Sequence, residues 1–304
     1  MSVEAPKFSG ILPISEKYHV GDWRLPGHGV PYSDCGSLRF RGCLNVDSHP
    51  ASLEDLDRGG KAFVQGYYRS CNRKECPVCY ERWAGLEAKR AVHRLLSFCV
   101  SQAMLYKIYQ VGDLEKRSRI VEQAFKRAKF KPIHVIFSVP LELYSLDIRK
   151  LRPRLYKIAR KSGVFGGSAI FHPFRERVDG SWYFSPHFHV IGFGWVRSVK
   201  RLHAKHGWVI KNVGVRKTVF GTLLYQLSHA GVHSDYHVVT WFGALAYNKF
   251  CAGPMLDSEP RCPLCDFELV ELLFVGGIDR PPPDEPGDYY LHAEDWVERV
   301  GRFG

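Results

Sequence analysis

The chain has 304 residues, of which 45% are hydrophobic and 13% aromatic, and this composition supports a packed core and argues against a disordered chain. Lysine and arginine outnumber aspartate and glutamate by 43 to 31, giving a formal net charge of +12 that favours a polyanionic partner, nucleic acid first. No apolar run approaches the ~18 residues of a membrane-spanning helix, and the first residues lack a signal-peptide pattern, so we expect a cytoplasmic protein with no membrane partner.

Composition and periodicity divide the chain into three predicted segments. Residues 1–128 hold a loop-rich, cysteine-bearing start followed by helices, residues 129–250 alternate short strands with helices, and residues 251–304 carry further cysteines and a proline-rich tail. Short strands joined by hairpin signals and accompanied by helices predict an α+β fold with an antiparallel sheet.

The first cysteine cluster has the spacing of a zinc knuckle. Cys71, Cys76 and Cys79 follow a Cys-x4-Cys-x2-Cys pattern, which supplies three of the four ligands of a structural zinc ion. The fourth ligand is predicted to be Cys43 or Cys35, and the spacing does not decide between them.

Helical periodicity follows this knuckle. The first helix carries one apolar stripe, formed by Trp83, Leu86, Ala91, Leu95 and Cys99. A basic helix at 115–130 and a short β-rich run at 134–140 come next. Residues 149–163 read as a helix in which Pro153 either causes a kink or marks the first turn.

A His-x-His pattern lies in a predicted strand. His187 and His189 are two residues apart, so both rings point to the same face of a sheet and could chelate a divalent ion. A two-residue turn at Asp179-Gly180 would place His172 opposite His187 on that face. Pro186 could introduce a bulge that shifts this register.

A tyrosine projects from the polar side of the helix that follows. Its apolar stripe comprises Val219, Phe220, Leu223, Leu224 and Leu227. Tyr225 lies on the opposite side, with His229 one turn later and Thr218 and Thr222 on the same face. A phenol in this position could act as a nucleophile if a cation stabilises the developing charge.

A second cysteine knuckle is formed by Cys262 and Cys265, preceded by Cys251. These three predict a second structural zinc ion, for which His292 or a cysteine from the first half would be the fourth ligand.

Three basic runs, at 116–131, 149–161 and 197–205, are candidate phosphate contacts. Three aromatic side chains are candidates for stacking on unpaired bases: Trp182, Tyr183 and Trp208.

Taken in order, these motifs resemble the HUH endonuclease superfamily, named for its His-hydrophobe-His strand. The motifs that carry the resemblance are HVIFSVP, HPFRE, SPHFHVIGFG and YQLSH, flanked by CNRKECPVCYERW and WFGALAYNKF. They are most similar to rolling-circle replication initiators of archaeal plasmids and viruses. The resemblance implies a central antiparallel sheet of about five strands with flanking helices.

The resemblance also implies a chemistry. Tyr225 would attack single-stranded DNA at a replication origin presented as a stem-loop, with Mg²⁺ or Mn²⁺ bound by His187, His189 and His172. A 5′-phosphotyrosine would form, and host helicase and polymerase would be partners. Many family members carry lysine where His229 stands, so His229 is expected to be a proton carrier, a phosphate contact or an alternative third ligand.

Tyr247 is the reserve nucleophile. A transposase or relaxase with the same chemistry, and a non-catalytic nucleic-acid-binding protein stabilised by zinc, are the alternatives that the sequence leaves open.

Overall fold

The computed structural model describes residues 19–20, 22–49, 61–180, 182–214, 218–255 and 260–299. The contacts divide the chain into two compact units. The first combines Met1–Pro31 with Asn72–Leu256, and the second combines Tyr32–Cys71 with Asp257–Gly304. This division cuts across the three consecutive segments expected from the sequence, because the second unit is assembled from two distant stretches of chain.

The first unit contains a five-stranded antiparallel sheet. In spatial order its strands are β8 (Val209–Asn212), β5 (Ile133–Ser138), β7 (Trp182–Gly194), β6 (Val164–Glu176) and β9 (Val239–Gly243). β6 and β7 are the longest, with 13 residues each, and form the central hairpin. Their burial on both faces explains why they read as nearly continuous apolar runs rather than as alternating patterns.

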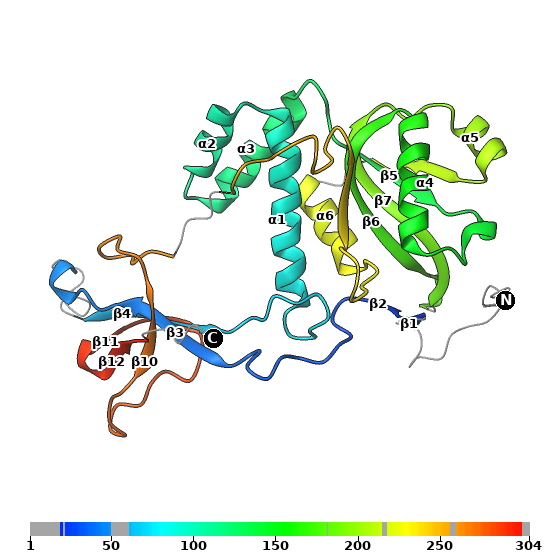
Figure 1. Ribbon diagram of the computed structural model, residues 1–304. Coiled ribbons are helices and arrows are strands. Elements are labelled where there is room, and N and C mark those ends of the chain that lie inside the picture. The colour runs from blue at the N-terminus through cyan, green and yellow to red at the C-terminus, as the bar shows by residue number, and fades with distance from the viewer. Residues whose placement is uncertain are drawn as a thin grey trace. The chain divides into compact units, whose positions relative to one another are not determined.

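Helices cover both faces of this sheet (Figure 1). On one face, α1 (Tyr80–Cys99) and α6 (Val219–Ser228) pack over Ile170, Ile191 and Phe193. On the other face, α4 (Ile148–Lys161) packs over Phe171 and Phe188. Because neighbouring residues of a strand point to opposite faces, the two cores are separate, and each side chain of β6 and β7 belongs to one of them.

The first unit contains further helices and a two-stranded ladder. Its further helices are α2 (Gln102–Tyr109), α3 (Leu114–Arg127), α5 (Val199–His206) and the 3-10 turn η2 (Leu141–Leu143). β1 (His19–Val20) and β2 (Trp23–Arg24) form a two-stranded ladder. Pro153 lies inside α4 and not in its first turn.

The second unit contains another five-stranded antiparallel sheet. In spatial order its strands are β11 (Gly287–Leu291), β4 (Ala62–Tyr68), β3 (Leu38–Cys43), β10 (Val270–Phe274) and β12 (Trp296–Glu298). The 3-10 turns η1 (Val46–Ser48) and η3 (Ala293–Asp295) flank it. Trp296 packs against Phe40 and Phe274, with ring centroids 4.9 and 5.3 Å away.

The predicted α+β class is confirmed, and the first unit contains an antiparallel sheet of the expected strand number. The second sheet is not predicted from the sequence. No helix in the described part of the chain is both long and apolar enough to cross a bilayer.

Candidate active site

The three histidines of the predicted site lie on the neighbouring strands β6 and β7. The ladder pairs His172 with His187 and Ile170 with His189, so His172 lies opposite His187 as the hairpin arithmetic predicts. All three histidine side chains are buried. They point to the sheet face covered by α1 and α6, because Ile170 and Ile191, two residues away along the same strands, belong to that core.

The hairpin reaches this register through a longer turn than the sequence predicts. The ladder ends at Glu176 and Trp182, so the connection is not a two-residue turn at Asp179-Gly180. Gly180 N–H donates instead to the carbonyl of Arg177 at 3.0 Å, and Gly180 has a φ of 77°, which glycine adopts without strain.

A bulge corrects the register before it reaches the histidines. The ladder is irregular between His172 and Phe174, where Ser185 and Pro186 on β7 lie opposite Pro173 alone. The bulge that Pro186 suggests is therefore present. Its one-residue shift cancels the one-residue shift at the tip of the hairpin, and the pairing of the histidines is unchanged.

The ring nitrogens of the three histidines lie within 4.8 Å of one another, close enough to share one ion. Nδ1 of His187 lies 2.8 Å from the carbonyl oxygen of Ser185, and Nδ1 of His189 lies 2.9 Å from Nε2 of His134. A carbonyl oxygen can only accept, so Nδ1–H of His187 donates and Nε2 keeps the lone pair that a metal requires. Outer hydrogen bonds of this kind are typical of metal-binding histidines.

The electrostatic environment keeps the rings of His172 and His187 neutral. Burial and the neighbouring histidines hold the pKa of His172 well below its usual value, and burial and the nearby Arg175 lower the pKa of His187 to about 3. Arg175 donates to Ser138 Oγ at 2.8 Å. Since Ser138 pairs with His187 across β5 and β7, the guanidinium is a fixed cation beside the cluster and a candidate phosphate ligand.

Tyr225 lies on an exposed part of α6, and its side chain is 41% exposed. Its ring centroid lies 4.9 Å from that of His229. His229 caps the end of α6, with Nδ1 3.0 Å from the carbonyl oxygen of Tyr225. Trp182 is nearly parallel to His229, with centroids 6.4 Å apart, so an aromatic surface adjoins the tyrosine.

The buried face of α6 contains two polar side chains, Thr222 and Gln226, both fully buried. The sequence predicts Thr222 on the face of Tyr225. That prediction is wrong because the helix turns these polar groups, and not only its apolar stripe, toward the sheet. Burial lowers the pKa of His172, and the main chain of Gln226 partly offsets this shift, so this turn of α6 lies beside the histidine cluster.

Three buried polar atoms at this place lack hydrogen-bond partners in the described part of the chain: His172 Nε2, Gln226 Nε2 and Gln226 Oε1. Leaving such groups unpaired costs about 1–3 kcal/mol each. An ion with its coordinating water would satisfy them, so the donor set fits a bound cation. Of the two candidate third ligands, His172 and not His229 belongs to the cluster.

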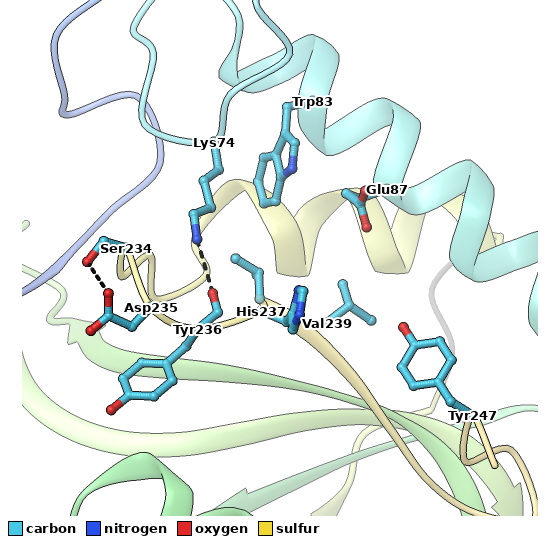
Figure 2. A pocket seen from close by; sticks show the side chains of 10 residues that line it. Lys74, Trp83, Glu87, Ser234, Asp235, Tyr236, His237, Val239 and Tyr247 are labelled. Atoms are coloured by element: carbon cyan, nitrogen blue, oxygen red, sulfur yellow. Dashed lines mark hydrogen bonds between the residues drawn. The ribbon is translucent and has the colours of Figure 1, made fainter.

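Two other candidates from the sequence lie elsewhere. Tyr247 lines a cavity of about 380 Å³ together with Lys74, Trp83 and Glu87 (Figure 2), and none of the three histidines lines it. The Arg94 guanidinium lies 4.6 Å from the Tyr247 ring centroid. Trp208 is only 2% exposed, so the prediction that it stacks on bases is wrong.

Two sets of cysteines are candidate ligands of a structural metal such as zinc. The knuckle formed by Cys71, Cys76 and Cys79 needs a fourth ligand, and Cys43 belongs to a different group, so Cys35 is the remaining candidate. A set of four cysteines is a typical closed zinc site.

Cys43 belongs to the other group, in the second unit, with His49, Cys262 and Cys265. Nδ1 of His49 lies 2.7 Å from the carbonyl oxygen of Lys61, and its Nε2 lies 3.4 Å from the sulfur of Cys262. Burial and the other sulfurs raise the pKa of Cys43 to about 12. A cation would reverse this shift by stabilising the thiolates.

Cys251 is predicted as a ligand of this second ion, and that prediction is wrong. Its side chain is exposed, and the cluster is completed without it by Cys43 and His49. Spacing alone favours Cys251 because it is close in sequence, whereas the sheet brings the true neighbours from the opposite half of the chain.

Comparisons with protein-family models, curated proteins and solved structures found no match for this chain. The function of the site is therefore argued from its own geometry.

Sequence reasoning misses three residues of the site: His134, Arg175 and Gln226. His134 and Arg175 lie inside motifs that the sequence singles out, but only the strand pairing shows that they reach the histidines. Gln226 could be suspected from its position next to Tyr225.

Proposed function

We propose that this protein cuts and rejoins single-stranded DNA through a covalent tyrosine intermediate, as HUH endonucleases that initiate rolling-circle replication do. One observation carries the proposal. Three buried histidines on adjacent strands form a metal-ligand group, and the helix that contacts this group presents an exposed tyrosine beside a histidine.

Each of the three histidines would hold the divalent ion through one ring nitrogen, Nε2 or Nδ1. Imidazole nitrogens favour Mn²⁺ over Mg²⁺, since Mg²⁺ prefers oxygen ligands. When bound, the ion would supply positive charge to the scissile phosphate. Arg175, fixed by Ser138, would bind a phosphate oxygen from the protein side.

In the cutting step, Tyr225 Oη attacks the phosphorus, the Oη–P bond forms and the P–O3′ bond breaks. The phenolic proton passes to a base, and the leaving 3′ oxygen gains a proton to become a free 3′-OH. His229 is a base beside Tyr225, with ring centroids 4.9 Å apart. In the tautomer whose Nδ1–H donates to the Tyr225 carbonyl, Nε2 holds the lone pair that accepts the proton.

Rejoining reverses these bonds. A 3′-OH attacks the phosphotyrosine, the P–O3′ bond forms, and the phenolate regains its proton. The bond energy of the phosphodiester is kept in the covalent intermediate, so this step needs no nucleotide cofactor.

The test uses the full chain, a random library of single-stranded oligonucleotides and Mn²⁺. Covalent adducts are isolated under denaturing conditions, and mass spectrometry identifies the linked tyrosine and the DNA end. We expect a 5′-phosphate on Tyr225. Tyr225→Phe removes the nucleophile and should abolish the adduct. The expected loss in the rate of adduct formation is about a thousandfold or more.

Tyr247→Phe is the matched control and should leave the adduct unchanged, since Tyr247 lines another cavity. An adduct on Tyr247 would refute our choice of nucleophile. Binding of the library without any adduct would refute the enzyme and favour a non-catalytic nucleic-acid-binding protein.

A further inference from the structure

Helix α4 carries a ridge of positive charge on its exposed side. The basic ridge consists of Lys150, Arg154, Lys157 and Lys161, all exposed. Their spacing of three or four residues aligns them along one side of the helix, over roughly 16 Å at 1.5 Å per residue. The ridge lines a groove of about 720 Å³, whose opposite wall includes His206.

This ridge is unfavourable for the isolated helix. Like charges three or four residues apart destabilise a helix by about 0.2–0.5 kcal/mol per pair. Among the described residues, no salt bridge involves any of the four side chains. Glu142 is the one acidic side chain among those lining the groove. An external polyanion would relieve the repulsion that the protein leaves uncompensated.

The lowered pKa of His206 reflects the positive potential inside the groove. Its Nε2 lies 3.3 Å from Lys161 Nζ, so the neutral ring accepts a hydrogen bond from the ammonium group. Burial and the charges of Lys161, Lys205 and Lys157 lower the pKa of His206. The groove thus already disfavours another cation and is suited to anions.

The groove lies on the sheet face opposite to the histidine cluster. Ile148, Leu151 and Leu155 of α4 pack on the core that contains Phe171 and Phe188, whereas α6 covers the other face (Figure 1). A phosphate in the groove cannot be the phosphate that Tyr225 attacks. Any DNA bound there must be a different part of the strand.

We propose that the α4 groove binds the phosphate backbone of a nucleic-acid segment that flanks the cleaved site. The identification of this segment as flanking DNA rests on the proposed function; the preference for a polyanion does not. A nucleic acid fits better than a membrane, because interfacial binding requires apolar side chains on the surface. The apolar residues of α4 are buried beneath the ridge.

The test measures equilibrium binding of single-stranded and hairpin DNA by fluorescence anisotropy over a range of NaCl concentrations. All chains carry Tyr225→Phe, so that no covalent product forms. The groove variant combines Lys150→Gln, Lys157→Gln and Lys161→Gln. The matched control combines Lys89→Gln, Lys107→Gln and Lys249→Gln, which are also exposed and remove the same charge outside the groove and outside the three basic runs.

We expect the groove variant to weaken binding roughly tenfold or more, and to reduce the slope of log K against log salt by about 2–3, since each lost phosphate contact contributes ~0.7–0.9. The control should change both values less. Equal losses in the two variants would show that only net charge matters and would overturn the proposal, as would an unchanged slope. Loss of binding to phosphatidylserine vesicles, with DNA binding intact, would also overturn it.

The same three groove substitutions are then placed in the chain that keeps Tyr225. Adduct formation on an oligonucleotide too short to leave the active site should be unaffected. If the unmutated chain forms no adduct while the groove variant still loses DNA binding, the proposed nicking function fails and the groove assignment stands. If adducts form but binding does not depend on the ridge, the groove assignment alone fails.

Discussion

His134 lies outside the cluster, and its side chain contacts a candidate ligand. Its Nε2 lies 2.9 Å from Nδ1 of His189, and both rings are buried. Removing such an outer hydrogen bond typically lowers metal affinity 10–100-fold. We therefore expect His134→Ala to weaken Mn²⁺ binding by about that factor, measured by isothermal titration calorimetry.

His93→Ala is the control for this prediction. His93 is also buried and hydrogen-bonded, through Nδ1 to the Tyr109 hydroxyl at 2.8 Å, but it does not belong to the cluster. It should lower stability without changing Mn²⁺ affinity. Equal losses of affinity in both variants would mean that His134 acts only through general stability.

A second prediction concerns His206. The charges of Lys161, Lys205 and Lys157 lower its pKa in addition to burial, and Glu142 lines the same groove. Lys157→Gln removes one positive charge, so the protonated ring becomes less unfavourable and the pKa of His206 must rise. NMR titration of the ring protons would measure the change, and a pKa that falls or stays constant would contradict it.

At the scale of elements, the basic ridge of α4 destabilises the helix through charge repulsion and also forms the proposed binding surface. Lys157→Glu replaces repulsion by attraction to Arg154 and Lys161, and should raise the free energy of unfolding by roughly 0.5–1 kcal/mol while weakening DNA binding. Urea unfolding and anisotropy would measure the two effects. Lys211→Glu on β8 makes the same charge change without a helical pair, so it should not bring the gain in stability.

Several elements can be predicted from the sequence because their patterns are local. The β6–β7 hairpin and the helix bearing Tyr225 are examples. Strand register is harder to predict. A two-residue turn predicts the pairing of His172 with His187, but the turn is longer, and a bulge compensates for the difference. The sequence predicts the wrong face for Thr222, because the centre of the buried face is taken from the apolar residues alone. Thr222 and Gln226 are polar but also lie on that buried face.

At the scale of the whole molecule, the cysteine groups could contribute to stability by holding structural zinc. Cys265→Ser should reduce the zinc content by about one ion per chain and destabilise the second unit, because a structural zinc ion contributes folding energy directly. Elemental analysis and urea unfolding would measure this. Cys251→Ser, an exposed cysteine outside the clusters, should change neither value, and a loss of zinc there would contradict our ligand assignment.

The arrangement of the second unit could not be predicted. Its sheet pairs β3 with β10, and its metal-ligand group joins Cys43 and His49 to Cys262 and Cys265. No periodicity links such distant positions, and several pairings are compatible with the same cysteine spacings. The histidine cluster can be predicted from the sequence because its members lie in one hairpin.

This pairing of distant segments also determines the order in which the two units can fold during synthesis. As the chain leaves the ribosome, β3 and β4 appear long before β10, since Asn72–Leu256 is synthesised in between. A lone two-stranded hairpin is only marginally stable in water, and the edge of β3 remains open to other strands until β10 arrives. The first unit can fold before the second is complete, so released chains truncated before residue 257 should display an ordered first unit and an unpaired β3–β4 hairpin.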